Sequence, residues 1–148
     1  MEVMKKMKKN NKGFTLAELL IVVAIIAVLV AIAIPVFTTR LEQSRETADI
    51  ANLRSAYAAA QVAALSGDKD GNPMKDGTSY YYDANDDIGL KEGAKPANGI
   101  GKGTATEGKA DSSALPDMVE YKGESDVRSQ FIKITYESGK VSKVVFSK

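Results

Sequence analysis

One acidic residue inside an apolar segment is the part of this sequence best suited to chemistry. Glu18 is the only charged residue between Phe14 and Phe37, and an acid in such a segment is costly to insert into a membrane unless a partner compensates its charge. One partner is local, because Thr15-x-x-Glu18 matches the capping box, in which each side chain accepts a hydrogen bond from the other residue's backbone N–H. The other partner is a cation supplied by a second molecule. The spacing alone is compatible with both.

The residue types that are missing exclude several kinds of site. The chain has 148 residues, no cysteine and no histidine. It therefore has no disulfide, no thiol nucleophile, no Ser-His catalytic pair and no zinc site built from these residues. We expect no catalytic residues and no cofactor. The 20 basic and 19 acidic residues leave a net charge of +1, which gives no sign of bulk nucleic-acid binding.

Two acidic segments could offer oxygen ligands to a cation. Asp68-x-Asp70-x-Asn72 resembles the start of a calcium loop, but Pro73 stands where that loop needs glycine, and the twelfth position has no glutamate. Acidic turns are usually just solvated turns, so we expect no metal site in either segment. The acids of the second segment are Asp83, Asp86 and Asp87.

A basic start precedes the apolar segment. Residues 1–13 hold five lysines and one acid, and all sixteen residues of Leu19–Ile34 are Leu, Ile, Val or Ala. The pattern fits a membrane anchor whose lysines hold the N-terminus in the cytoplasm. It also fits a secretory signal peptide that ends near Ala33, where small residues allow cleavage. Phe14–Ala33 is twenty residues, which is long for a signal peptide and adequate for a bilayer of about 30 Å.

The residues that follow Lys12 support a third interpretation. From Gly13 to Ile26 they read GFTLAELLIVVAII, which resembles the class III signal of type IV pilins and the related pseudopilins. The resemblance implies cleavage between Gly13 and Phe14 by a prepilin peptidase, followed by N-methylation of Phe14. It also implies that Glu18 pairs with the α-ammonium of Phe14 on a neighbouring subunit, a cation that exists only after cleavage.

The same resemblance extends to Pro35 and departs at Ala27. Pilins commonly carry a proline at the position of Pro35, and many carry a glycine near the position of Ala27. Because proline lacks an N–H and clashes with the preceding turn, we expect a helix kink at Pro35. Alanine forms helices better than glycine by about 1 kcal/mol, so we expect the helix to stay continuous elsewhere, or to unwind only close to Pro35.

The resemblance predicts a structural subunit of a type IV pilus filament and not an enzyme. It implies as partners copies of the chain itself, a prepilin peptidase, an assembly platform with an ATPase motor, and the membrane. The subunit would lie in the inner or cytoplasmic membrane, with its leader cytoplasmic, and then in a pilus at the cell surface. The alternatives are a pseudopilin of a type II secretion or DNA-uptake system and, outside the family, a secreted binding module starting near Ile34. We predict no nucleic-acid partner, because the loop lysines are sparse and interrupted by acids. These are Lys91, Lys95, Lys102 and Lys109.

The segment from Thr15 to Leu65 is predicted to be one helix, with Gly67 just past its end. Residues 38–65 contain neither Gly nor Pro, and an apolar stripe recurs at helical spacing. Arg45 lies one turn from an acid on either side, which predicts an exposed, charged opposite face. The acids are Glu42 and Asp49, and the stripe is Ile50, Leu53, Tyr57, Ala60 and Ala64.

The remainder is predicted to be a small sheet reached through a long loop. Residues 67–116 are rich in glycine, and residues 130–146 read as a β-hairpin whose turn contains a glycine. Tyr80-Tyr81-Tyr82 and Met118–Tyr121 could add short strands. We expect an α+β fold in which the long helix packs on a small antiparallel sheet. The predicted divisions are a cleaved leader 1–13, a membrane or filament-core helix 14–37, an amphipathic helix 38–66 and a globular head 67–148.

Overall fold

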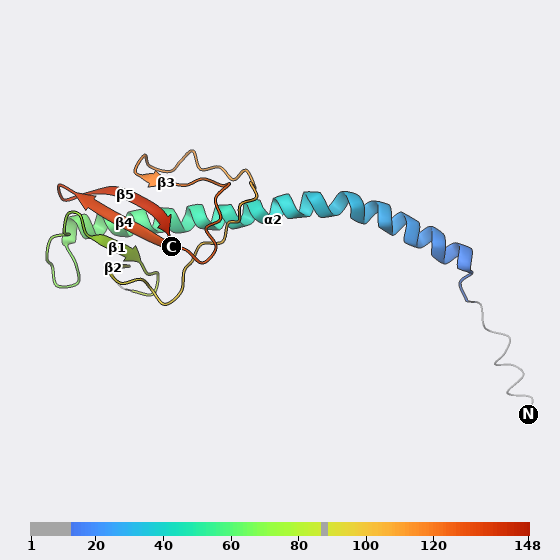
Figure 1. Cartoon of the computed structure of the whole chain (residues 1–148), viewed down its shortest axis with the longest axis horizontal. Helices are drawn as coiled ribbons and strands as arrows, with labels where there is room; N and C mark the ends of the chain where they lie inside the picture. Colours follow the sequence, from blue (N-terminus) through green and yellow to red (C-terminus); the bar gives the residue numbers. More distant parts are fainter. Residues whose placement is uncertain (1–12, 87–88) are drawn as a thin grey trace, which may run out of the picture. The chain divides into compact units, whose positions relative to one another are not determined.

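A single long helix, α2, runs from Leu16 to Ser66 in the computed structural model, which describes residues 13–86 and 89–148 (Figure 1). The helix begins and ends within one residue of the predicted positions, and its assignment continues through Pro35. A kink at Pro35 stays a prediction. The helix ends where Gly67, at φ 82°, donates its N–H to the Ala63 carbonyl at 2.8 Å, since glycine adopts this left-handed conformation without strain.

The chain divides into a first unit that ends at Phe37 and a second unit, Thr38–Lys148. Most of the first unit is the apolar half of α2. In the described part of the chain, α2 is the one helix long and apolar enough to cross a membrane. The predicted leader 1–13 lies outside the described residues except for Gly13.

The second unit contains a five-stranded sheet in the order β2-β1-β4-β5-β3. The predicted hairpin is present as the antiparallel pair β4–β5, and β1 pairs antiparallel with both β4 and β2. The β3 strand instead pairs parallel with β5, so the sheet is mixed and not antiparallel throughout as predicted. A strand reached through a long crossover, unlike one reached through a tight turn, is not obliged to reverse direction. The strands are β1 Ser79–Tyr82, β2 Leu90–Glu92, β3 Val119–Glu120, β4 Phe131–Glu137 and β5 Lys140–Ser147.

The core of the second unit lies between α2 and one face of the sheet, against which the far half of the helix lies (Figure 1). Leu53 is completely buried and belongs to the same cluster as Ile132 and Ile134 of β4. Three fully buried alanines let the sheet approach the helix closely. The buried stripe of the helix is therefore centred on different residues from the stripe that the sequence predicted. Tyr57 and Ala64 lie at its edge, only partly buried. The alanines are Ala56, Ala60 and Ala63.

Candidate functional site

The first turn of α2 is closed by the capping box that the sequence predicted. Thr15 donates its backbone N–H to Glu18 Oε2 at 2.8 Å, and Glu18 donates its own to Thr15 Oγ1 at 3.2 Å. Glu18 therefore has a local structural role, while a partner on a second chain stays a prediction. Gly13 and Phe14 precede the helix and are exposed. Cleavage and N-methylation there also stay predictions, and Lys12 lies outside the described residues.

The apolar half of α2 is exposed on every side. Its large apolar side chains, from Leu16 to Phe37, each expose between 46% and 76% of their surface. An amphipathic surface helix would bury one stripe and expose the other. A helix that is apolar all round requires an apolar environment around its whole circumference, as a membrane or a bundle of like helices provides. The environment that this segment needs is therefore supplied by something other than its own chain.

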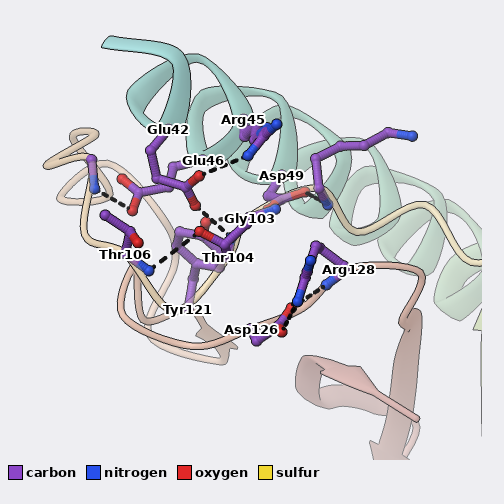
Figure 2. Close-up of polar contacts among 12 residues, drawn as sticks. Glu42, Arg45, Glu46, Asp49, Gly103, Thr104, Thr106, Tyr121, Asp126 and Arg128 are labelled. Atoms are coloured by element: carbon purple, nitrogen blue, oxygen red, sulfur yellow. Dashed lines mark hydrogen bonds and ion pairs between the residues drawn. The ribbon is translucent and has the colours of Figure 1, made fainter. Parts of the chain in front are cut away.

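A second site lies where the sequence predicted an exposed charged face, and that prediction is wrong. Glu42, Glu46 and Asp49 expose only 2%, 1% and 0% of their surface. They lie at positions i, i+4 and i+7 on one face of α2 and form what we call the carboxylate ladder (Figure 2). Arg45 does bond to Glu42, at 3.3 Å. The other groups around the ladder are mainly backbone N–H donors from a distant loop.

That loop, residues 101–110, is called the strap. Asp49 accepts the N–H groups of Lys102 and Gly103, each at 2.7 Å, one on each carboxylate oxygen. Glu46 likewise accepts one N–H on each oxygen, from Gly108 at 2.7 Å and Ala110 at 2.9 Å. Glu42 accepts the N–H of Thr104 (Figure 2). The ladder thus provides acceptors for the backbone N–H groups of a loop that lies outside the five strands.

Glycines bring the ladder into contact with the loops. A Cβ atom at Gly108 would lie 2.2 Å from the backbone nitrogen of Gln43, and one at Gly123 would lie 2.7 Å from Glu46 Oε1. Neither distance is possible for a real side chain. The strap therefore lies directly on the helix backbone because no side chain separates them.

Burial raises the pKa of Asp49 above its ordinary value, because desolvation outweighs the two strap N–H groups and the Tyr121 hydroxyl that favour the charged form. The nearby charge of Glu42 also raises it. Tyr121 donates its hydroxyl to Asp49 at 3.3 Å, and its own pKa is raised, chiefly by burial and then by the neighbouring carboxylates. The Asp49 carboxylate thus accepts hydrogen bonds from two backbone N–H groups and the Tyr121 phenol, all of them uncharged.

The acidic turns are stabilised by local bonds. Asp68 accepts the backbone N–H groups of Asp70 and Asn72, both at 2.9 Å, and Asp83 pairs with Lys91 at 2.8 Å. In the described residues, which exclude Asp87, no three acids come together in a way that could hold a metal ion. These contacts explain the acidic turns without a bound cation.

The four loop lysines do not form one patch. Lys91 pairs with Asp83, and the Lys95 ammonium lies 5.4 Å from the centre of the Phe131 ring. Lys102 and Lys109 belong to the strap. We still expect that the chain has no nucleic-acid partner.

An outward face of α2 in the second unit carries two large apolar side chains that no core residue covers. Val62 exposes 61% of its surface and Leu65 exposes 91%. They lie three residues apart, on one face of the last turns of the helix. Sequence reasoning did not single them out, although their offset from the buried stripe was a usable signal.

Comparison with known proteins places the N-terminal segment in a defined group. Residues 8–34 match the family described as the prokaryotic N-terminal methylation motif. The chain is 54% identical over 56 residues to the type IV narrow pilus major component PilA5 of Thermus thermophilus, covering 36% of this chain and 48% of that protein. It is 50% identical over 50 residues to the type IV major pilin protein PilA of Myxococcus xanthus, covering 34% and 23%.

A fimbrial protein of Pseudomonas aeruginosa is 47% identical over 62 residues, which cover 40% of this chain and 38% of that protein. The chain therefore spans less than half the length of each of these relatives. No solved structure is significantly similar to it. The N-terminal methylation motif and the similarity to type IV pilins agree with the resemblance that the sequence indicated.

Proposed function

We propose that this protein is the structural subunit of a type IV pilus filament, and that it polymerises through the apolar half of α2 after removal of its leader. The observation that carries the proposal is the apolar half of α2, which exposes apolar side chains on every side and carries one acid, Glu18, in its first turn. In the membrane, lipid surrounds this helix; in a filament, the same helices of other copies do so. The similarity to type IV pilins supports the same function.

The exchange of lipid for protein is nearly neutral in hydrophobic free energy, because both environments are apolar. Packing and charge pairing must therefore favour the filament. Cleavage between Gly13 and Phe14 would create an α-ammonium beside the apolar helix, and Glu18 of a neighbouring copy would neutralise it. A prepilin peptidase, an assembly platform and an ATPase motor complete the proposed pathway from the membrane to the cell surface.

Intact-mass analysis of material sheared from the cell surface tests the processing step. The proposal expects a chain that begins at Phe14 and carries one additional methyl group. A chain beginning at Ile34 would contradict it and would favour a secreted module with a signal peptide that ends near Ala33. Electron micrographs of the same cells separate a pilus subunit, which gives long surface filaments, from a pseudopilin, which does not.

A matched pair of substitutions tests the role of Glu18. Glu18→Gln keeps an oxygen for the capping box and removes the charge, whereas Thr15→Ala removes the hydroxyl of the cap and keeps the charge. An unpaired ammonium in the filament core would cost about 3–5 kcal/mol, and the lost cap about 0.5–2 kcal/mol of local helix stability. We expect Glu18→Gln to be cleaved and retained in the membrane with few filaments, and Thr15→Ala to assemble nearly normally.

The readout compares sheared filaments with the processed membrane pool in strains that carry only one change. Abundant filaments from Glu18→Gln would refute charge pairing and leave the cap as the role of Glu18. Loss of filaments from both variants at equal levels would show that the first turn matters as a cap and not as a charge.

A further inference from the structure

We propose that the strap and the carboxylate ladder lock residues 42–49 of α2 in the helical conformation, so that helix opening that begins near Pro35 stops at Glu42. The proposal concerns a conformational device within the second unit and goes beyond the function of the apolar segment. It rests on the five strap N–H groups that the ladder accepts, on the burial of the three acids, and on the position of Pro35 about two turns before Glu42.

Pro35 weakens α2 locally. It cannot donate the backbone hydrogen bond that its position in a helix requires, and its ring crowds the carbonyl one turn earlier. The six residues that follow, 36–41, are all exposed, so little buried surface holds this part of the helix in place. Segments with few buried contacts open most readily. Glu42 is the first buried residue after the proline.

The ladder exists only while this part of the chain is helical. Residues at i, i+4 and i+7 share one face of an α-helix, whereas an unwound chain would turn them away from one another. The strap N–H groups would then lose their acceptors, and an unpaired buried N–H is unfavourable. Opening of the helix at 42–49 therefore requires the strap to open as well, and this coupling raises its free-energy cost.

The bonding pattern requires carboxylates and not merely polar side chains. Both oxygens of Glu46 accept an N–H from the strap, and so do both oxygens of Asp49. An amide in either place would keep one acceptor and turn its NH₂ group against the second donor. Substitution of Glu by Gln is therefore a nearly isosteric change that removes one bond and adds a donor–donor clash (Figure 2).

Hydrogen exchange of the full chain in detergent micelles tests the coupling, followed by mass spectrometry at peptide resolution. Loss of a charge-assisted bond in Glu46→Gln should speed exchange at least tenfold in the strap, 101–110, and also in helix residues 42–49. Glu120→Gln is the matched control, because the Glu120 side chain is exposed and forms a surface ion pair with Lys143, at 3.1 Å. It should leave both segments unchanged.

The double variant Pro35→Ala/Glu46→Gln tests where the opening begins. Without the proline, residues 42–49 should regain most of their protection although the strap still exchanges fast. Faster exchange of the strap alone in Glu46→Gln would refute the lock. Equal loss of helix protection with and without Pro35 would refute the proline as its origin. If Glu46→Gln unfolds the whole unit, seen as lost protection of β4, then Glu42→Ala, which removes the acceptor of a single strap N–H, takes its place with the same expected outcomes.

Discussion

Leu53 and Leu65 lie on the same helix, twelve residues apart, and the structure predicts opposite consequences for shortening them. Leu53 exposes 0% of its surface and packs in the cluster with Ile132, Ile134 and Tyr136. Leu65 exposes 91%. Leu53→Ala should destabilise the second unit, and Leu65→Ala should leave its stability nearly unchanged.

The magnitude for Leu53 follows from its surroundings. Buried Leu→Ala changes cost about 2.7–5.0 kcal/mol, with the higher values where the cavity cannot collapse. The buried helix face beyond Leu53 continues with Ala56 and Ala60, which have no side chain to move into the space, and the opposite wall is a hydrogen-bonded sheet. We therefore expect about 3–5 kcal/mol, against about 0.5 kcal/mol or less for Leu65→Ala. Leu53→Asp should unfold the unit, because it buries an unpaired charge.

Urea denaturation of the full chain in detergent measures both changes through the near-ultraviolet circular dichroism of tyrosine. All six tyrosines lie between Tyr57 and Tyr136, and the chain has no tryptophan, so the signal reports the second unit alone. Leu53→Ala should lower the midpoint at an unchanged slope. Equal midpoints for the two variants would refute the packing of Leu53. Leu65→Ala should instead reduce filament yield, since its side chain is available to neighbouring copies.

Three further changes have defined outcomes. Tyr136→Phe removes the bond from its hydroxyl to the Ala60 carbonyl, at 2.8 Å, and should cost about 1 kcal/mol in the same denaturation assay; no shift of the midpoint would contradict this. Gly108→Ala should detach the strap, because its Cβ would lie 2.2 Å from the helix backbone at Gln43, and limited proteolysis should then cut within 101–110; wild-type resistance would argue against the contact. Because burial raises the pKa of Asp49 above 3.8, the folded protein takes up this proton at higher pH than the unfolded chain does. The contribution of Asp49 to stability should therefore grow as the pH falls through the raised pKa towards 3.8. It is measured as the difference in free energy of unfolding between the wild-type chain and Asp49→Asn. A difference that shrinks with acidification would contradict the raised pKa.

The sequence was sufficient to predict the elements whose residue pattern repeats along the chain. The long helix followed from residues 38–65, which lack Gly and Pro, and the hairpin from two β-rich runs around one glycine. The direction of β3 did not follow, because it depends on a crossover loop whose path leaves no periodic signal. The β2 strand was missed for a similar reason, since three residues within a glycine-rich loop carry too short a pattern.

The carboxylate ladder was misread because its acids stand next to Arg45. Acids and a base one turn apart are typical of a solvated helix face, and nothing near them in sequence indicates burial. Their main partners are backbone N–H groups of the strap, more than 50 residues away, and a backbone donor leaves no trace in residue type. The glycines at 103 and 108 were the available signal, because a Cβ atom at these positions would collide with the Asp49 side chain and with the helix backbone at Gln43.

The order of the strands along the chain has a consequence for biosynthesis. The strand at the centre of the sheet, β4, and its hairpin partner, β5, follow every other element in sequence. The alanine face of α2 therefore has almost no sheet to pack on until these strands have been made. Contacts between segments so far apart also form slowly. The nascent chain thus waits with its helix complete and its core unformed, and the membrane anchor that we propose for the apolar half of α2 would keep that aggregation-prone species dilute and in place until β5 arrives.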